Sequence, residues 1–447
     1  MSDSKLGRRA RRAVMQRVSA PRRVQRVAFL GPVPPTPTGI ATYDRAVLDG
    51  LDRIGFTKEL PVDVFWPVHQ RHFSEVPGYL LGVYQLGNNV EFHLDIYRMV
   101  WHTPGLIVLH DLALDDFVRG LQSATDPLGF VAVREALDAR ARLRSLDARR
   151  NEPLRIPWAA AVARKARGIV VHSEFCRRYL EGFGCRTPIF VVPHPPVEEA
   201  SAILASEARG RQLRAKVEAR GGRILVVAPG DMNEAKRLDA LLKAAASLPA
   251  DVHVALVGRK VPTYDVWPAA HGSGLGERLH VEQDVRDQDF LGWLHAADIV
   301  VDLRHPHRGE VSGSLARAMQ VGRPTIVSAT GTYLDAPEGT TLSVTAGITN
   351  PVELAGRILT LAEDPALRLR MGETARAYMD DLRASEATAH GYADAIRATI
   401  AVVNDATSPA MDRWARALAD IGVSQAYLDA GYGLSYAQAL ESFKRSP

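Results

Sequence analysis

A carboxylate, two serines and a glycine gather in the segment "RGEVSGSLARAMQVG", residues 308–322. Ser312, Gly313 and Ser314 stand where a helix should begin, and free backbone N–H groups and hydroxyls at such a start can hold a diphosphate. Glu310 only accepts hydrogen bonds when it is ionised, so it would repel phosphate and suit sugar hydroxyls. The segment therefore predicts a ligand with both features, and a nucleotide sugar has both.

A lysine and an arginine follow another expected strand, in "VVAPGDMNEAKRLDALLKAAA". Lys236 and Arg237 could neutralise a diphosphate there, close to the turn at Gly230. A cation near a helix N-terminus costs about 0.3–1 kcal/mol through the helix dipole, so an anionic ligand would help to explain the pair. The alternative is a solvated cation in the first turn of a helix.

The first half of the chain has two comparable positions. Gly39, in "PPTPTGIATY", precedes an expected helix whose N-terminus favours an anion, and a glycine there allows close approach of a ligand. His110, in "GLIVLHD", directly follows an apolar strand, where it could bond a substrate hydroxyl or transfer a proton. A purely structural turn is the alternative at both positions.

Strands and helices alternate along most of the chain, which predicts parallel sheets covered on both faces. A length of 447 residues favours two domains. We predict an α/β fold with two Rossmann-like, doubly wound domains, residues 26–198 and 199–390, flanked by a basic arm at 1–25 and a helical tail at 391–447. Ligands of such sheets bind beyond the carboxyl ends of the strands, so the two domains should face a shared cleft.

The expected elements follow from short apolar runs and the helical segments between them. Residues 199–221 should connect the domains as a helix, and "PVELAGRILTLAEDPALRLRMGETARAYM" should form the last helix of the second domain. The expected strands are "RVAFLG", "VDVFW", "GLIVLHD", "GIVVHS" and "IFVVPH" in the first domain, and "RILVVAPG", "VHVALVG", "LHVEQ", "DIVVDL" and "PTIVSA" in the second.

The net charge of +4 conceals a division along the chain. Residues 1–28 hold nine Lys and Arg and one acid, so the rest of the chain has a net charge of −4. This distribution argues against nucleic-acid binding, which needs a basic face on the folded domain. Residues 5–20 could form a basic amphipathic helix on an anionic membrane surface, or a disordered arginine-rich leader.

The location of the chain is predicted from what its sequence lacks. It has no apolar run of the roughly 18 residues that a membrane-spanning helix needs, and no apolar core of a secretory signal. We expect a cytoplasmic protein, with peripheral contact to the inner face of the membrane as an option. Cys176 and Cys185 are too few for a disulfide framework or a metal site.

Several segments, taken in order over roughly residues 26–380, resemble the retaining glycosyltransferases of family 4, which have the two-domain GT-B fold. The Gly-Glu-x-Ser-Gly form and "YQLGNN" are similar to a bacterial subgroup found with polysaccharide and surface-glycan assembly. The segments that carry the resemblance are "PPTPTGIATY", "YQLGNNVEFH", "GLIVLHD", "VVHSEF", "VVPHP", "APGDMNEAKR", "ALVG" and "RHPHRGEVSGSLARAMQVGRPTIVS".

The resemblance implies a role for each matching position. His110 and Glu310 would contact the transferred sugar and form the catalytic centre. The backbone of Val285, in "DVRDQDF", would hold the nucleobase, and the acceptor should bind near Asn88 and Asn89. The positions expected to bind the rest of the donor, its diphosphate above all, are Gly39, Gly230, Lys236, Arg237, Ser312, Gly313, Ser314 and Arg317.

The sequence departs from the family pattern at two of these positions. The second glutamate of the Glu-x7-Glu signature is absent, and alignment on "AMQVGRP" puts Arg317 there, where it could add charge neutralisation. The arginine that many members carry six residues before the lysine is Gly230 here. We expect Arg237 or Arg259 to compensate for it.

The implied reaction is transfer of a sugar from a nucleoside-diphosphate sugar to a carbohydrate or lipid-linked acceptor hydroxyl, with retention at the anomeric carbon. We expect a hexosyltransferase of surface polysaccharide or glycoconjugate synthesis that needs no cofactor and no metal, because Lys236 and helix N-termini should meet the charge of the leaving group. Two alternatives stay open: a sugar-nucleotide epimerase on the same fold, and a non-catalytic nucleotide-sugar-binding partner in a glycan-assembly complex.

Overall fold

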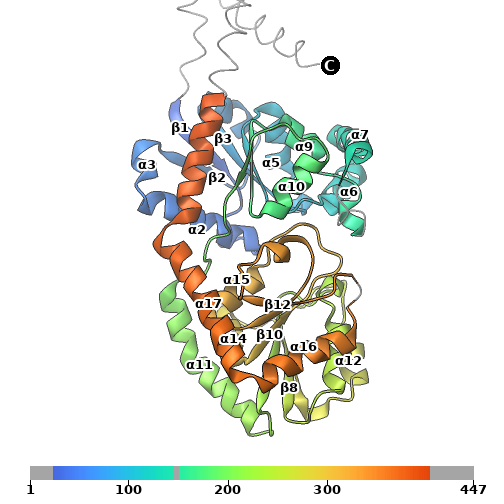
Figure 1. The fold of residues 1–447 in the computed structure, drawn as a ribbon. Coiled ribbons are helices and arrows are strands. Elements are labelled where there is room, and N and C mark those ends of the chain that lie inside the picture. The colour runs from blue at the N-terminus through green and yellow to red at the C-terminus, as the bar shows by residue number, and fades with distance from the viewer. Residues whose placement is uncertain (1–23, 145–150, 348, 403–447) are drawn as a thin grey trace, which may run out of the picture.

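The computed structural model describes residues 24–144, 151–347 and 349–402. The predicted membrane contact through residues 5–20 lies outside the described residues, as does the chain beyond residue 402. Two α/β domains are stacked end to end, and the first domain lies above the second in Figure 1. Each contains one six-stranded sheet, so the predicted α/β fold with two Rossmann-like domains is confirmed.

The first sheet has its strands in the order β2-β1-β3-β4-β5-β6, and every neighbouring pair is parallel. β4 and β5 are buried at each residue, as expected for central strands of a sheet with helices on both faces. The strands are β1 (Val24–Leu30), β2 (Val62–Phe65), β3 (Tyr79–Leu86), β4 (Leu106–Leu109), β5 (Gly168–Val171) and β6 (Ile189–Val191).

The second sheet has the order β12-β11-β10-β7-β8-β9, again with parallel neighbours throughout. β7, β8 and β10 are completely buried. The strands are β7 (Ile224–Pro229), β8 (Val252–Gly258), β9 (Leu279–Gln283), β10 (Ile299–Asp302), β11 (Thr325–Ser328) and β12 (Thr341–Val344).

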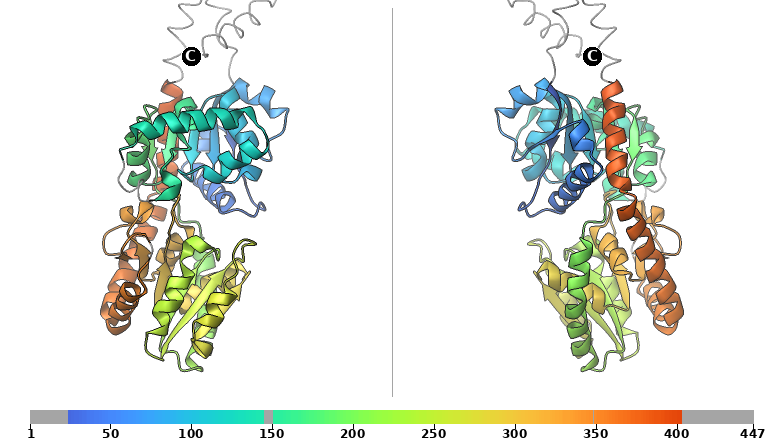
Figure 2. Two further views of the ribbon diagram at one scale, coloured as in Figure 1. Left: turned by 90° about the vertical axis from the view of Figure 1, so that its right-hand side faces the viewer. Right: turned by 90° about the vertical axis from the view of Figure 1, so that its left-hand side faces the viewer.

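Helices cover both faces of each sheet (Figures 1 and 2). Those of the first domain are α2 (Gly39–Arg53), α3 (Phe56–Glu59), α4 (His72–Glu75), α5 (Val90–His102), α6 (Asp115–Ser123), α7 (Pro127–Arg142), α9 (Ala160–Lys165) and α10 (Glu174–Gly182). Those of the second are α11 (Ala200–Glu218), α12 (Leu238–Ala246), α13 (Trp267–Gly272), α14 (Asp287–Ala296), α15 (Gly313–Val321), α16 (Pro351–Glu363) and α17 (Pro365–Ala384).

Short 3₁₀ turns complete the connections: η1 (Val76–Gly78), η2 (Glu152–Leu154), η3 (Glu234–Lys236), η4 (Gly276–Arg278) and η5 (Gly331–Asp335). None of the helices in the described ranges is both long and apolar enough to cross a bilayer.

All ten predicted strands are present, and the structure adds two, β3 and β12. The predicted long last helix of the second domain was wrong in one respect: it is two helices, α16 and α17, with Asp364 between them. Asp364 caps α17 by accepting a hydrogen bond from the Leu367 N–H at 2.8 Å, and Pro365 occupies the first position of that helix. Proline is favoured at that position because it has no N–H to leave unpaired.

The chain returns to the first domain after α17. Helical residues 387–402 pack against the first sheet, where Tyr392 and Ile396 join a buried cluster with Val27 and Tyr43. Figure 2 shows this helix along the side of the first domain. The boundary expected at residue 390 falls inside this helix, which ties the two domains together outside the cleft.

Candidate active site

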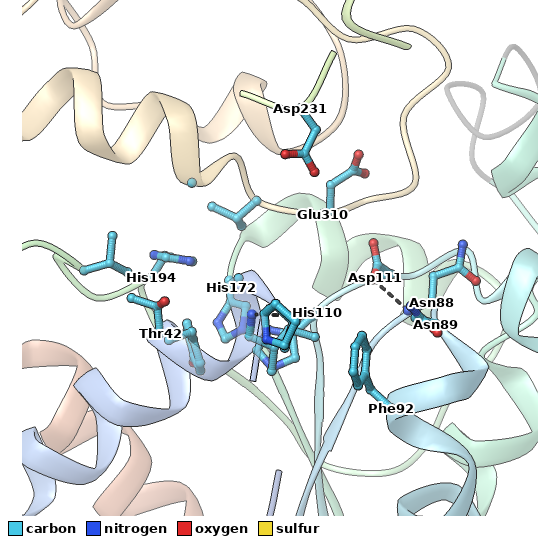
Figure 3. Close-up of a pocket in the computed structure, with 18 of the residues that line it drawn as sticks. Thr42, Asn88, Asn89, Phe92, His110, Asp111, His172, His194, Asp231 and Glu310 are labelled. Atoms are coloured by element: carbon cyan, nitrogen blue, oxygen red, sulfur yellow. Dashed lines mark hydrogen bonds between the residues drawn. The ribbon is translucent and has the colours of Figure 1, made fainter. Parts of the chain in front are cut away.

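A cavity of about 480 Å³ lies between the two domains, at the carboxyl ends of both sheets (Figure 3). It is where the strand order of the fold predicts a ligand. The lining residues that the first domain contributes are Pro37, Thr38, Gly39, Ile40, Thr42, Tyr43, Asn88, Asn89, Phe92, His93, His110, Asp111, His172 and His194. The other lining residues are Val197, Asp231, Arg259, Glu310, Val311, Gly313 and Arg317.

Glu310 reaches the cavity from the loop between β10 and α15. One carboxylate oxygen accepts a hydrogen bond from the Arg304 guanidinium, and the other accepts one from the Arg308 N–H at 2.6 Å. Burial acts to raise the pKa of Glu310, but the charge of Arg304 and the backbone N–H groups outweigh it and hold the pKa below its usual value. The carboxylate is therefore ionised and acts only as a hydrogen-bond acceptor.

Ser312 caps the helix that follows. Its hydroxyl oxygen accepts a hydrogen bond from the Leu315 N–H at 3.3 Å and donates to Asp302 at 2.5 Å. Gly313, the first residue of α15, lines the cavity. The helix start is therefore in the expected place, although the Ser312 hydroxyl is used inside the protein.

Lys236 is buried in an ion pair rather than exposed to the cavity. Its ammonium group lies 2.5 Å from Asp302 and 3.2 Å from the Pro229 carbonyl, and 8% of its side chain is exposed. Burial lowers the pKa of Lys236 against the opposing effect of Asp302. Asp302 also accepts a hydrogen bond from the Tyr333 hydroxyl at 2.9 Å, so one buried carboxylate gathers several donors.

The remaining donor-side residues fall into two groups. Gly230, with a φ of +110°, packs beside Ser314 and Lys236, and a Cβ there would lie 2.6 Å from the Ser314 hydroxyl oxygen. Arg237 pairs with Asp239 at 3.1 Å and is not among the lining residues. Val285 lines a separate hollow of about 340 Å³ between α11, β9 and α14, not the central cavity.

Arg317 lines the cavity and pairs with Glu198, at 2.6 Å, from the segment that joins the domains. Its guanidinium also lies over the Phe290 ring, 5.9 Å from the ring centre. Arg259 enters the cavity from the end of β8 and makes two 2.8 Å hydrogen bonds to Asp231. Of the two arginines expected to compensate for Gly230, Arg259 is therefore the one in the cavity.

Gly39 begins α2, and the Thr38 hydroxyl caps that helix by accepting from the Ile40 N–H at 3.3 Å. A Cβ on Gly39 would meet nothing within 4 Å. The Arg259 guanidinium lies 3.5 Å from the Pro37 carbonyl oxygen, across the cleft from its own domain. The N-termini of α2 and α15 thus both reach the cavity.

His110 forms part of a group of neutral histidines on the floor of the cavity. Its Nε2 lies 2.8 Å from the Gln85 side-chain oxygen, and its ring meets Tyr43 edge to face at 4.7 Å between centres. His172 and His194, from the ends of β5 and β6, contact the same tyrosine at 5.0 and 5.1 Å. Burial lowers the pKa of all three, to about 4 for His172 and about 3 for His194.

Both asparagines expected at the acceptor side line the cavity, but their side chains are engaged in local structure. Asn89 caps α5 by accepting from the Glu91 N–H at 2.8 Å. Asn88 accepts from the Phe117 N–H at 2.9 Å and donates to Asp115 and Asp116 at 3.0 and 3.2 Å. They shape this part of the cavity.

Asp111 approaches Glu310 from the opposite domain (Figure 3). One of its carboxylate oxygens accepts from the Asn88 N–H at 2.9 Å. Burial, and then the negative charge of Glu310, raise the pKa of Asp111 to about 7. These two facing carboxylates therefore differ: the pKa of Glu310 lies below its usual value, and that of Asp111 lies near neutral pH.

Sequence reasoning missed several lining residues. His172 and His194 follow strands that were correctly predicted, in "VVHS" and "VVPH", so their position at strand ends was the available signal. Tyr43 and Asp231 carried no comparable signal. Within the described ranges, no group of three or more His, Cys, Asp or Glu side chains is arranged to hold a metal ion.

A family model, Glycosyl transferases group 1, matches residues 223–364. This segment runs from β7 to the end of α16 and carries Lys236, Glu310 and the start of α15. No curated protein sequence matches the chain. The sequence pattern of this glycosyltransferase group therefore falls on the second domain.

Solved structures are similar to the chain over both domains. Sucrose-phosphate synthase from Thermosynechococcus elongatus has a TM-score of 0.57 and 18% identity, over 85% of this chain and all of that one. Anabaena HepE in complex with UDP has a TM-score of 0.56 and 16% identity, over 84% of this chain and 99% of that one. WaaG, a glycosyltransferase involved in lipopolysaccharide biosynthesis, has a TM-score of 0.52 and 17% identity, over 83% of this chain and 99% of that one. At these identities the likeness shows the fold, which is GT-B.

Proposed function

We propose that the protein is a glycosyltransferase that moves a sugar from a nucleoside diphosphate to an acceptor hydroxyl, with retention of anomeric configuration. One observation carries the proposal: the interdomain cavity joins the ionised Glu310 to the N-termini of α2 and α15. Helix N-termini suit a diphosphate and a carboxylate suits sugar hydroxyls, so one ligand can satisfy both. The family match over residues 223–364 supports the same ligand class.

The geometry supports a division of labour between the domains. The Glu310 carboxylate would hold hydroxyls of the transferred sugar, and Arg259, Arg317 and the helix starts would meet the diphosphate as its charge develops. His110 donates from Nε2 if the Gln85 oxygen accepts, which leaves Nδ1 as an acceptor. The neutral histidines add no positive charge beside the reacting sugar.

These cations supply charge for the leaving group, so we propose that transfer needs no added metal and no cofactor. Enzyme treated with EDTA should keep its turnover. Loss of turnover that Mg²⁺ or Mn²⁺ restores would contradict this.

The first experiment is a thermal-shift panel with the diphosphates of uridine, guanosine, adenosine, cytidine and thymidine. A ligand at about 100 times its dissociation constant should add about 2.7 kcal/mol to the free energy of unfolding. HepE has been solved with UDP-glucose, which puts the uridine compound first. A shift with one base would identify the donor class, and the matching nucleotide sugar should then be consumed with release of that diphosphate.

One observation favours a second candidate, a non-catalytic nucleotide-sugar-binding partner in a glycan-assembly complex. Lys236 and Ser312 are both bonded to Asp302, and Arg317 is bonded to Glu198, so the expected phosphate ligands are already engaged. A diphosphate shift without any donor consumption would favour this candidate. No shift with any base would contradict both.

We also propose that the acceptor is a surface polysaccharide or glycoconjugate precursor held at a membrane, which the basic residues 5–20 would contact. Removal of residues 2–22 should reduce sedimentation with vesicles that contain anionic lipid, while leaving turnover of a water-soluble acceptor unchanged. Neutral vesicles are the control. Equal sedimentation of the two proteins would rule out this role for the arm.

A further inference from the structure

The loop that carries Glu310 is held by the opposite domain. The N–H groups of Leu112 and Ala113 both donate to the Arg308 carbonyl, each at 2.9 Å. Asn151 pairs with both backbone polar groups of His307: its oxygen accepts from the His307 N–H at 3.1 Å, and its amide donates to the His307 carbonyl. The backbone of the loop is thus docked on the first domain by four hydrogen bonds.

The side chain of Arg308 strengthens the docking. Its Nε lies 3.0 Å from one oxygen of Asp115, and its Nη2 lies 3.4 Å from the other and 3.3 Å from Asp116. A guanidinium that meets a carboxylate with two nitrogens is geometrically specific as well as attractive. Arg308 is 30% exposed and Asp115 is 15% exposed, so solvent screens this contact less than it screens a surface pair.

Close packing limits how the loop can dock. Gly309 has a φ of +79°, and a Cβ there would lie 2.6–2.8 Å from three atoms of the Leu112 side chain. The Cys176 thiol donates to the Gly309 carbonyl at 3.2 Å. The segment from Arg308 to Glu310 therefore has little freedom once it is docked.

We propose that Arg308 is a positioning residue, whose docking on the first domain sets where the Glu310 carboxylate stands in the cavity. The same residue holds Glu310 through its own N–H, 2.6 Å from the carboxylate. The inference rests on the proposed function, which places Glu310 on the donor sugar. It adds that the position of the Glu310 carboxylate, which belongs to the second domain, is set by contacts to the first domain.

The contacts also reach the acceptor side. Asp115 and Asp116 accept hydrogen bonds from Asn88, which lines the cavity beside Asp111. One chain of contacts therefore runs from Asn88 through Asp115 and Arg308 to Glu310. A change at the acceptor side should be felt at the donor sugar through Arg308.

The test compares Arg308→Ala with Arg178→Ala in the full chain. Arg178 pairs with Asp335 at 3.2 Å, also across the domains but away from the cavity residues, so it is the matched control. Loss of positioning should lower turnover of the nucleotide sugar at saturating donor about 10- to 100-fold. The affinity for the nucleoside diphosphate should stay within about twofold of wild type, because Arg308 positions Glu310, which contacts the sugar and not the diphosphate.

Two further measurements separate positioning from general structure. Arg308→Lys keeps the charge but loses the two-pronged contact, so it should recover only part of the lost turnover. Amide hydrogen exchange at Leu112 and Ala113 should speed up in Arg308→Ala and stay unchanged in Arg178→Ala, since those N–H groups donate to the docked loop.

The outcomes are distinct. Unchanged turnover and unchanged exchange in Arg308→Ala would overturn the inference, and so would equal losses of turnover in both variants. Failure of the wild-type protein to bind any nucleoside diphosphate would instead reject the proposed function, and the exchange measurement would still decide whether Arg308 docks the loop.

Discussion

The two domains present chemically different side chains to a ligand in the cavity. The first domain presents histidines that burial keeps neutral, namely His110, His172 and His194. The second presents ionised groups that are already paired, such as Glu310 with Arg304 and Arg259 with Asp231. The neutral wall can bind by hydrogen bonds without a charge to satisfy, whereas the charged wall must exchange partners when an anion arrives.

The largest expected effect comes from the charged wall. Glu310→Gln keeps the size and one hydrogen-bond acceptor but removes the charge that faces the donor sugar. Turnover should fall on the order of 100-fold, because the lost interaction is with the reacting sugar. Binding of the nucleoside diphosphate should persist, because Glu310 does not contact the diphosphate in the proposed function. Glu310→Ala should lose most of its transfer in the same way and still fold.

Steady-state kinetics and a melting curve for each variant check this prediction. Near-normal turnover of either variant would remove Glu310 from the site. The corresponding change on the neutral wall, His110→Gln, should cost less, because it replaces one neutral partner with another.

The next effect separates a pair that is buried from a pair that is exposed. Lys236→Met leaves the completely buried Asp302 without its cation, and the free energy of unfolding should fall by about 3–5 kcal/mol. Lys243→Ala, at the exposed pair with Asp239, should change it by no more than about 0.5 kcal/mol. Denaturant unfolding measures both.

Adding Asp302→Asn to Lys236→Met should restore part of the loss, because the unpaired buried charge is then gone. A loss at Lys236 no larger than that at Lys243 would mean that the lysine is free to leave Asp302. It would then be available to a phosphate at little cost.

The third effect is a pH dependence of stability that comes from Asp111, which approaches Glu310 from the first domain. The raised pKa of Asp111 means that the folded protein holds a proton which the unfolded chain, with a pKa near 3.8, has released. The contribution of Asp111 to the free energy of unfolding should therefore fall as pH rises from about 4 to about 7, and be flat above that, whereas the buried histidines contribute with the opposite sign. Asp111→Asn removes this slope, so its gain in melting temperature over wild type should grow across the same range.

Melting temperatures from pH 4 to 8 check the sign. Asp95→Asn, at an exposed pair with Arg98, is the control and should show no such growth. A gain for Asp111→Asn that stays constant from pH 4 to 8 would show that the carboxylate is ionised throughout and held by Arg308 and Arg304.

The sequence predicted the layered fold well because burial of central strands leaves continuous apolar runs, as in "GLIVLHD" and "DIVVDL". β3 was missed, although it lies between β1 and β4, because "YLLGVYQL" contains a glycine and two tyrosines and gives a weaker signal. The structure places Glu310, Gly39 and His110 at the cavity, and their positions were readable because strand ends and helix starts are local features.

The partners of those residues could not be predicted from local patterns. Lys236 meets Asp302 because β7 and β10 are neighbours in the sheet, which is a property of strand order and not of spacing. The histidine group depends likewise on the adjacency of β4, β5 and β6. The cap formed by Asn89 was readable, since asparagine before a helical run is a common cap, but the family resemblance favoured a substrate role.

The smallest effect tests whether the charged wall exchanges partners. Asp231 competes with a phosphate for Arg259, and the pair is largely exposed, with side chains 39% and 58% accessible. An exposed pair of this kind is worth about 0.2–1 kcal/mol, so Asp231→Asn should raise the affinity for the nucleoside diphosphate by up to about fivefold. Calorimetric titration of the diphosphate found in the thermal-shift panel measures it.

Arg259→Ala decides what such a gain means. If Asp231 acts by occupying Arg259, the gain should vanish when Asp231→Asn is combined with Arg259→Ala, which is a double-mutant cycle on one pair. A gain that persists without Arg259 would come from the general loss of a negative charge near the phosphate. The second domain would then act on the phosphate through its net charge. The two walls would differ in charge, and the ionised groups would not need to exchange partners.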